Sequence, residues 1–106
     1  MPDQLDVHRN PGRNKSVIPY VVVVQSNRFR EASRRVVVPL LAAEAFGTPD
    51  SDVGPHFAIE GRTVVLDPLQ IANVPASVLG PAVASLISQD DRIVRALDIR
   101  LSRAWR

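Results

Sequence analysis

The 106-residue sequence predicts a small, mainly β domain with antiparallel strands and one helix near its C-terminal end. Two observations support this fold class. Short apolar segments rich in β-branched residues alternate with Pro- and Gly-containing turns along most of the chain, whereas residues 88–106 show helical periodicity. The length leaves room for one domain, and we expect it to span residues 1–106 without linker or internal repeat.

The composition excludes several classes of protein. The chain has no cysteine, which excludes disulfide frameworks, thiolate catalysis and Cys-ligated zinc. Residues 1–15 lack the apolar segment of a secretory signal, and no apolar run approaches the ~20 residues that span a bilayer. We therefore expect a cytoplasmic protein. The formal charge of +2 is too small to indicate polyanion binding by itself.

The first third of the chain predicts a β-hairpin. Residues 4–8 alternate Leu5 and Val7 with polar residues, which is the period of a half-buried strand. The Asn-Pro-Gly sequence at residues 10–12 is a strong turn signal. Residues 17–26 contain four consecutive valines, which indicate a strand covered on both faces. Pro19 is tolerable near the start of that strand.

The next segment predicts a connection, a strand and a loop. Residues 26–33 are polar, with Arg28, Phe29 and Arg30 expected to be exposed. Residues 35–41 predict a third strand that ends near Pro39. Residues 42–46 are compatible with more strand or with one helical turn. Residues 47–55 have the composition of a loop, which we expect to be mobile.

Residues 56–60 and 62–67 flank Gly61 and predict a second hairpin. Residues 69–74 predict a short segment that closes the sheet. Residues 76–80 lie between two prolines and suit an edge strand or a turn. Pro81 is also compatible with the first position of a short helix over residues 81–87.

Residues 88–106 predict the C-terminal helix. Ser88 is the expected N-cap, and Asp90 and Asp91 fall in the first turn, where acidic side chains favour a helix N-terminus. The rest of the segment carries an apolar stripe, typical of a helix packed on a core. The stripe consists of Ile93, Leu97, Leu101 and Trp105, with Ala96 and Ala104 beside it.

Five short segments together indicate a family. Taken in order and with their spacing, they resemble the CcdB family of bacterial toxins, the poison halves of toxin–antitoxin pairs. They are Gln4–Val7, Val24–Ser26, Arg34–Leu40, Val74–Gly80 and Asp91–Leu101.

The resemblance implies a fold and a mode of action. The fold is a small antiparallel SH3-like barrel or sheet with a side hairpin and a C-terminal α-helix. The implied assembly is a homodimer with the two helices close together across the twofold axis. Such toxins bind the A subunit of DNA gyrase and trap it on cleaved DNA, without cofactor, metal or catalysis of their own. A cognate antitoxin, whose disordered tail wraps the toxin, removes it from gyrase.

The resemblance also implies a target-binding site, although this chain differs there. The family ends in Trp-Gly-Ile, and an ungapped alignment from Ile93 places Ser102 where that tryptophan stands. Trp105 follows one helical turn later, about 4.5 Å along the axis and on a similar face. Trp105 either anchors the target, or packs over Leu101, or belongs to a toxin whose target has changed or been lost. The implied gyrase-binding residues are Leu101, Ser102, Ala104, Trp105 and Arg106; the resemblance leaves the antitoxin-contacting residues unknown.

An RNA-cleaving toxin of related fold is the enzymatic alternative. Cleavage needs a positioned base and acid with a cation for the developing charge. A structural interpretation competes with it, because two of the candidate arginines lead into a strand and the candidate glutamate flanks a turn. The candidates are His8, His56, Glu60, Arg34, Arg35 and Arg62.

Other sites have weaker support in the sequence. Two histidines are too few for a His-rich metal site, and the acids at positions 50, 52, 90 and 91 fit loop and cap roles. The sequence has no phosphate loop, nucleophile elbow or dinucleotide fingerprint. Direct nucleic-acid binding is not expected, since Phe29 is the one stacking ring among the arginines at positions 28, 30, 34 and 35.

Overall fold

The computed structural model describes residues 2–45 and 54–101, and there the chain forms seven strands, one α-helix and four short 3-10 turns. The predicted mobile loop over residues 47–55 lies largely outside these ranges. The strands are β1 (Asp6–Arg9), β2 (Tyr20–Val23), β3 (Arg34–Ala42), β4 (His56–Ile59), β5 (Arg62–Leu66), β6 (Ala72–Pro75) and β7 (Ala82–Ser85). The helix is α1 (Asp90–Leu101), and the turns are η1 (Asn27–Phe29), η2 (Ala43–Ala45), η3 (Ala76–Val78) and η4 (Ile87–Gln89).

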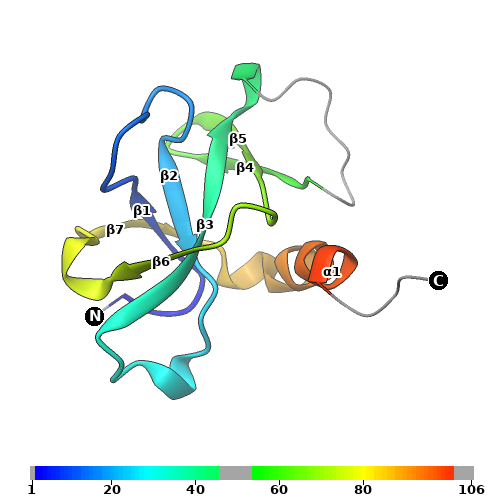
Figure 1. The fold of residues 1–106 in the computed structure, drawn as a ribbon. Coiled ribbons are helices and arrows are strands. Elements are labelled where there is room, and N and C mark those ends of the chain that lie inside the picture. Colours follow the sequence, from blue (N-terminus) through cyan, green and yellow to red (C-terminus); the bar gives the residue numbers. More distant parts are fainter. Residues whose placement is uncertain (1, 46–53, 102–106) are drawn as a thin grey trace.

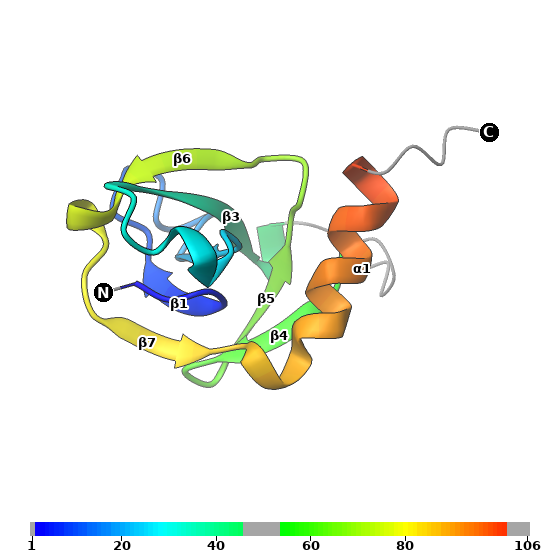
Figure 2. The same cartoon turned by 90° about the horizontal axis from the view of Figure 1, so that it is seen from below.

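The strands form one curled antiparallel sheet in the order β4-β5-β3-β2-β1-β7, with β6 paired to β3. The sheet curls into a half-barrel, and the hairpin of β4 and β5 lies at one end of it (Figure 1). Figure 2 shows α1 flanking β4 and β5, on the opposite side from the N-terminal residues. The predicted fold class, mainly antiparallel β with a C-terminal helix, is confirmed.

The third strand continues through Pro39, so the prediction that it ends there is wrong. Pro39 pairs with Val21 of β2, and its carbonyl accepts a hydrogen bond from the Asp67 N–H at 3.1 Å, on the opposite edge. In an antiparallel strand the carbonyl and the nitrogen of a residue point to the same edge. The Pro39 nitrogen, which lacks an N–H, therefore also points away from β2. On that edge β3 passes from pairing with β6 to pairing with β5, and no bond to β2 is lost.

The first hairpin forms as predicted, with β1 antiparallel to β2. Strand β2 begins directly after Pro19, and all four of its residues are buried. Tyr20 and Val22 face one side of the sheet, whereas Val21 and Val23 face the other. The prediction of a strand covered on both faces is therefore confirmed.

The region around the predicted helix start differs from expectation. Ser88 lies inside η4 and α1 begins two residues later, at Asp90, so Ser88 is not the helix N-cap. Asp90 and Asp91 do occupy the first turn. Residues 82–85 form β7 on the edge of β1 instead of a short helix after Pro81. An isolated helix of about seven residues is marginal, and main-chain pairing with β1 is the stronger alternative.

The remaining open predictions are resolved. The alanine-rich segment after β3 makes one helical turn, η2, and the segment between the two prolines forms the turn η3. The second hairpin turns through Glu60 and Gly61, whose φ angles of 53° and 76° are left-handed. Two consecutive left-handed residues match the twist of a two-residue hairpin.

The two faces of the sheet carry separate apolar clusters. The larger one lies under α1, and Val24, Val83, Ala84 and Leu97 pack against its margin. The smaller one, on the other face, contains only four buried residues, with Val74 packed against it. The larger cluster consists of Leu5, Val7, Tyr20, Val22, Val38, Leu40, Phe57, Ile59, Val64, Leu66, Leu86, Ile93 and Ala96. The smaller cluster consists of Val21, Val23, Val37 and Leu79.

Candidate partner-binding site

The implied binding site begins at the end of α1, and the core fixes the position of this helix. Ile93 and Ala96 are fully buried in the larger cluster, and Leu97 packs against it. The first half of the predicted apolar stripe is thus confirmed. Burying an isoleucine stabilises the folded state by roughly 1.5–3 kcal/mol, so α1 is an integral part of the domain.

Arg92 attaches the helix to the outer strand β4. Its guanidinium donates to the His56 carbonyl at 2.8 Å and to the Gln89 side-chain oxygen at 2.6 Å. The same group lies 4.5 Å from the centre of the Phe57 ring, a cation–π distance. This role could not be predicted from the sequence, because an arginine in the first turn of a helix is usually solvated.

The outer side of α1 remains apolar in part. Val94 and Ile99 are about half exposed, and Leu69 and Ile71 are exposed on the connection between β5 and β6. That connection runs beside α1 in both views (Figures 1 and 2). Val94 and Ile99 are five residues apart, about 140° around the helix, so they lie on either side of its buried face and do not form one patch.

Leu101 is the last residue of α1, and the other implied gyrase-binding residues follow it directly. Ser102, Ala104, Trp105 and Arg106 lie outside the described residues. The structure therefore describes the implied site only as far as Leu101.

Arg35 has a structural role that the sequence did not reveal. Its side chain is only 2% exposed, although it carries a charge. Its donors go to four main-chain carbonyls: Nε to Pro2, Nη1 to Ala32 and Arg34, and Nη2 to Arg30, at 2.6–3.1 Å. These bonds tie the N-terminal segment and the η1–β3 connection to β3. This engagement removes Arg35 from the candidates for an accessible catalytic cation.

His8 is also buried, at 2% exposure. Its Nδ1 lies 2.7 Å from the Gly80 carbonyl, which can only accept, so Nδ1 carries the proton in this contact. Its Nε2 is buried without a hydrogen-bond partner among the described residues. His8 therefore connects β1 to the segment before β7 and is shielded from a large substrate.

The remaining cleavage candidates have partners of their own. Arg34 donates to the side chain and carbonyl of Asn73, and Arg62 lies 3.5 Å from Glu44. His56 is half-buried on β4. Among the described residues, the one side-chain hydrogen bond between two candidates is that of Arg35 to the main-chain carbonyl of its neighbour Arg34, and it brings no two candidate side chains together.

Glu60 belongs to a small network at the hairpin tip. It accepts the Tyr20 hydroxyl at 2.8 Å and pairs with Arg9 at 2.8 Å. Burial raises the pKa of the Tyr20 phenol above its ordinary value, and the hydrogen bond to Glu60 adds to this shift. The network stabilises the neutral phenol and attaches the side hairpin to the first hairpin.

Two features are absent from the described residues. No group of three or more His, Cys, Asp or Glu residues within 2–45 and 54–101 is arranged to hold a metal ion. In the same part of the chain, no helix has the length and apolarity needed to cross a membrane.

Comparison with models of known protein families gives a match over nearly the whole chain. The family model described as CcdB protein matches residues 4–102. This range includes every strand of the sheet and the whole of α1. A search of curated proteins finds no significant match.

Proposed function

The chain belongs to the CcdB family, toxins of bacterial toxin–antitoxin systems, and from this we propose that it is a non-enzymatic poison of DNA gyrase. In this proposal the last residues of the chain, with Trp105 as the anchor, bind the A subunit and hold the enzyme on cleaved DNA. The toxin acts in the cytoplasm, where its target lies.

The family match carries the proposal, and the seating of α1 supports it. Because Ile93 and Arg92 attach the helix to the sheet, the residues after Leu101 start from a fixed point. A helix seated on the core gives the segment that follows it a fixed attachment point on the domain. An indole adds a large rigid apolar surface with one N–H donor, the combination common at interface hot spots.

We further propose that the chain acts as a homodimer and that a cognate antitoxin neutralises it. The family match supports the dimer, and exposed aliphatic side chains on α1 and on the β5–β6 connection are available to a partner copy. A twofold axis near the helices would bring two Trp105 anchors together, and linked binding events reinforce each other.

The test is a DNA-cleavage assay with purified gyrase, supercoiled plasmid and the full chain. A poison gives linear DNA after detergent and protease treatment, in an amount that increases with toxin concentration. No linear product, together with no capture of the gyrase A subunit by the toxin, would contradict the proposed target.

The variant Trp105→Ala tests the anchor. We expect poisoning to fall by about 30-fold or more, as for truncation of an interface hot spot worth about 2 kcal/mol. Ile87→Ala is the matched control, because Ile87 is an exposed apolar side chain just before α1. Equal poisoning by both variants would exclude Trp105 as the anchor.

Two further measurements separate the alternatives. A toxin that keeps antitoxin binding but arrests growth without cleaving DNA has changed its target. A dimer that binds antitoxin and leaves growth unaffected has lost its activity. Discrete cuts in long single-stranded RNA, in metal-free buffer, would instead support the enzymatic alternative.

A further inference from the structure

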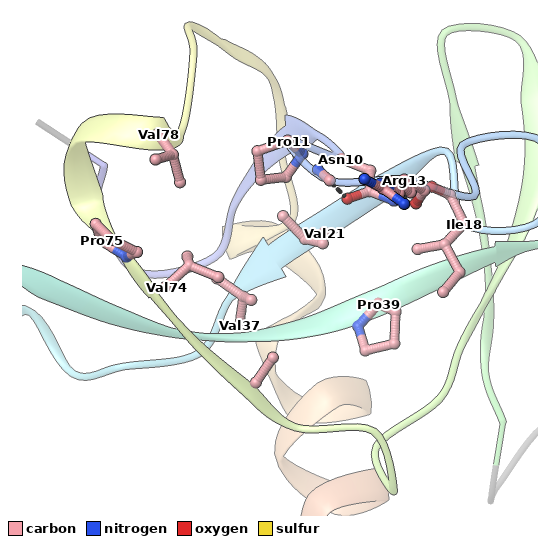
Figure 3. Close-up of a pocket in the computed structure, with 12 residues that line it drawn as sticks. Asn10, Pro11, Arg13, Ile18, Val21, Val37, Pro39, Val74, Pro75 and Val78 are labelled. Atoms are coloured by element: carbon pink, nitrogen blue, oxygen red, sulfur yellow. Dashed lines mark hydrogen bonds between the residues drawn. The ribbon is translucent and has the colours of Figure 1, made fainter.

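An apolar groove lies on the face of the sheet opposite α1. Its volume is about 420 Å³, within the ~300–1,000 Å³ typical of ligand sites. Val21, Val37 and Pro39 form its floor on β2 and β3, and the segments 10–18 and 72–78 rise on either side (Figure 3). Among the described residues the apolar cluster on this face has only four buried members, whereas α1 covers the other face.

The side chain of Asn10 holds one flank of the groove in place. Its amide nitrogen donates to the Arg13 and Ile18 carbonyls at 3.0 and 2.9 Å, and its amide oxygen accepts the Gly12 N–H at 2.9 Å. Asn14, in the left-handed region at φ 65°, accepts two further main-chain bonds within the same segment. The flank is therefore preformed, which lowers the entropic cost of binding a ligand.

The opposite flank is apolar and anchored to β3. Val74 and Pro75 belong to β6, which pairs with β3, and Val78 follows in η3. Val78 is 47% exposed at the groove and is available to a ligand. The walls and floor thus present aliphatic side chains and proline rings, which favour aliphatic groups of similar size.

Charge distinguishes this groove from a purely apolar one. The flank at residues 10–18 carries Arg13 and Lys15 and no acidic residue, and the flank at residues 72–78 carries no ionisable side chain. Both basic residues are exposed, and Arg13 lines the groove. Arg13 therefore places one positive charge on the lining, and Lys15 adds a second two residues further along the same flank. This charge attracts acidic ligands and disfavours basic ones.

We infer that this groove binds an acidic peptide segment that places aliphatic side chains on the valine floor and carboxylates beside Arg13 and Lys15. The chemistry of the groove does not depend on the toxin's target. The identification of the cognate antitoxin as the source of the segment rests on the proposed function.

Fluorescence anisotropy with the full chain tests the inference. The probe is a fluorescein-labelled peptide of alternating glutamate and valine or leucine, and two comparison peptides replace either the aliphatic residues by serine or the glutamates by lysine. We expect saturable binding of the first peptide and at least tenfold weaker binding of the other two.

Two matched pairs of variants locate the binding site. Val78→Asp should weaken binding by about tenfold, since it places a carboxylate in the apolar wall, while Ile87→Asp leaves it unchanged. Both residues are exposed aliphatics in 3-10 turns, so both variants should fold. Arg13→Glu should weaken binding by about fivefold, and Arg28→Glu, on the exposed η1 turn, should change it less than twofold.

No saturable binding, or equal binding by the Val78→Asp and Ile87→Asp variants, would overturn the groove as the site. Equal binding of the glutamate and lysine peptides would overturn the charge preference. These results are independent of the gyrase assay, so failure of the inference and failure of the proposed function are distinguishable. A purified antitoxin whose affinity follows the same pattern of variants would identify it as the source of the segment.

Discussion

The two faces of this sheet are built differently. The face under α1 has a continuous core in which Val22, Leu40 and Ile93 are fully buried among apolar neighbours. The opposite face has a core of four residues, an open groove and the two buried polar side chains, His8 and Arg35, found in the described part of the chain. Apolar packing holds the first face together, whereas the second also depends on directed hydrogen bonds.

This difference matters for binding. The well-packed face fixes α1, and through it the start of the residues proposed to contact gyrase. The second face cannot bury enough apolar surface to close, and its free surface is available to a ligand. Changes on the two faces should therefore alter different properties of the protein.

The largest effect should come from Arg35→Ala, on the second face. The change leaves four carbonyls without their donor and a cavity in place of the side chain. We expect a loss of about 3–5 kcal/mol in the free energy of unfolding, measured by urea denaturation. Because the bonds reach Pro2 and Arg30, amide exchange should rise first in the N-terminal segment and in the η1–β3 connection.

Arg35→Met is the control, since it keeps much of the apolar stem and removes only the donors. If the methionine variant keeps most of the wild-type free energy of unfolding, packing rather than hydrogen bonding stabilises this face, and the contrast between the faces is wrong. If it loses nearly as much as the alanine variant, the hydrogen bonds stabilise this face, as the contrast requires.

Val22 and Val23 offer a matched comparison of the two cores. They are neighbours in β2 and fully buried, and they face the larger and the smaller cluster respectively. We expect Val22→Ala to cost about 2–3 kcal/mol and Val23→Ala about 1 kcal/mol less, because a cavity in a closed core relaxes less. Both changes carry the same loss of strand propensity, so urea denaturation reports the packing difference.

Equal losses would show that the smaller cluster is packed as tightly as the larger one. A greater loss for Val23→Ala would reverse the comparison between the faces.

Periodicity predicted the parts of this fold that depend on local pattern. The valine run of β2 and the stripe begun by Ile93 each specify a buried face, and the strand and helix follow from them. The predicted strand over residues 4–8 begins later, at Asp6, because Leu5 is buried from a turn in which its φ is 67°. Pro39 was misjudged because whether a proline breaks a strand depends on the edge its nitrogen faces. That edge is decided by strand pairing, which local sequence does not contain.

The roles of the polar residues were harder to predict. Nothing near Arg35 in the sequence indicates that carbonyls from two segments converge on it, because Pro2 is 33 residues away. The groove likewise depends on segments 10–18 and 72–78 meeting across β2 and β3. The proposed target-binding residues after Leu101 came from the family resemblance, and they stay a prediction.

The smallest effect should come from Tyr20→Phe, at the edge of the α1 face, where a polar group remains near solvent. Losing the hydroxyl bond to Glu60 should cost about 1 kcal/mol at neutral pH. The raised pKa of the phenol means that the folded state favours the neutral form. Its contribution is complete below the ordinary pKa of about 10 and is lost as pH rises through the raised value. The stability difference between wild type and Tyr20→Phe should therefore shrink in alkali.

Tyr20 is the one tyrosine of the chain, so ultraviolet titration of the phenolate follows this group alone. A titration midpoint at or below that of free tyrosine would show that this edge is open to water and that the α1 face is less closed than its apolar core indicates.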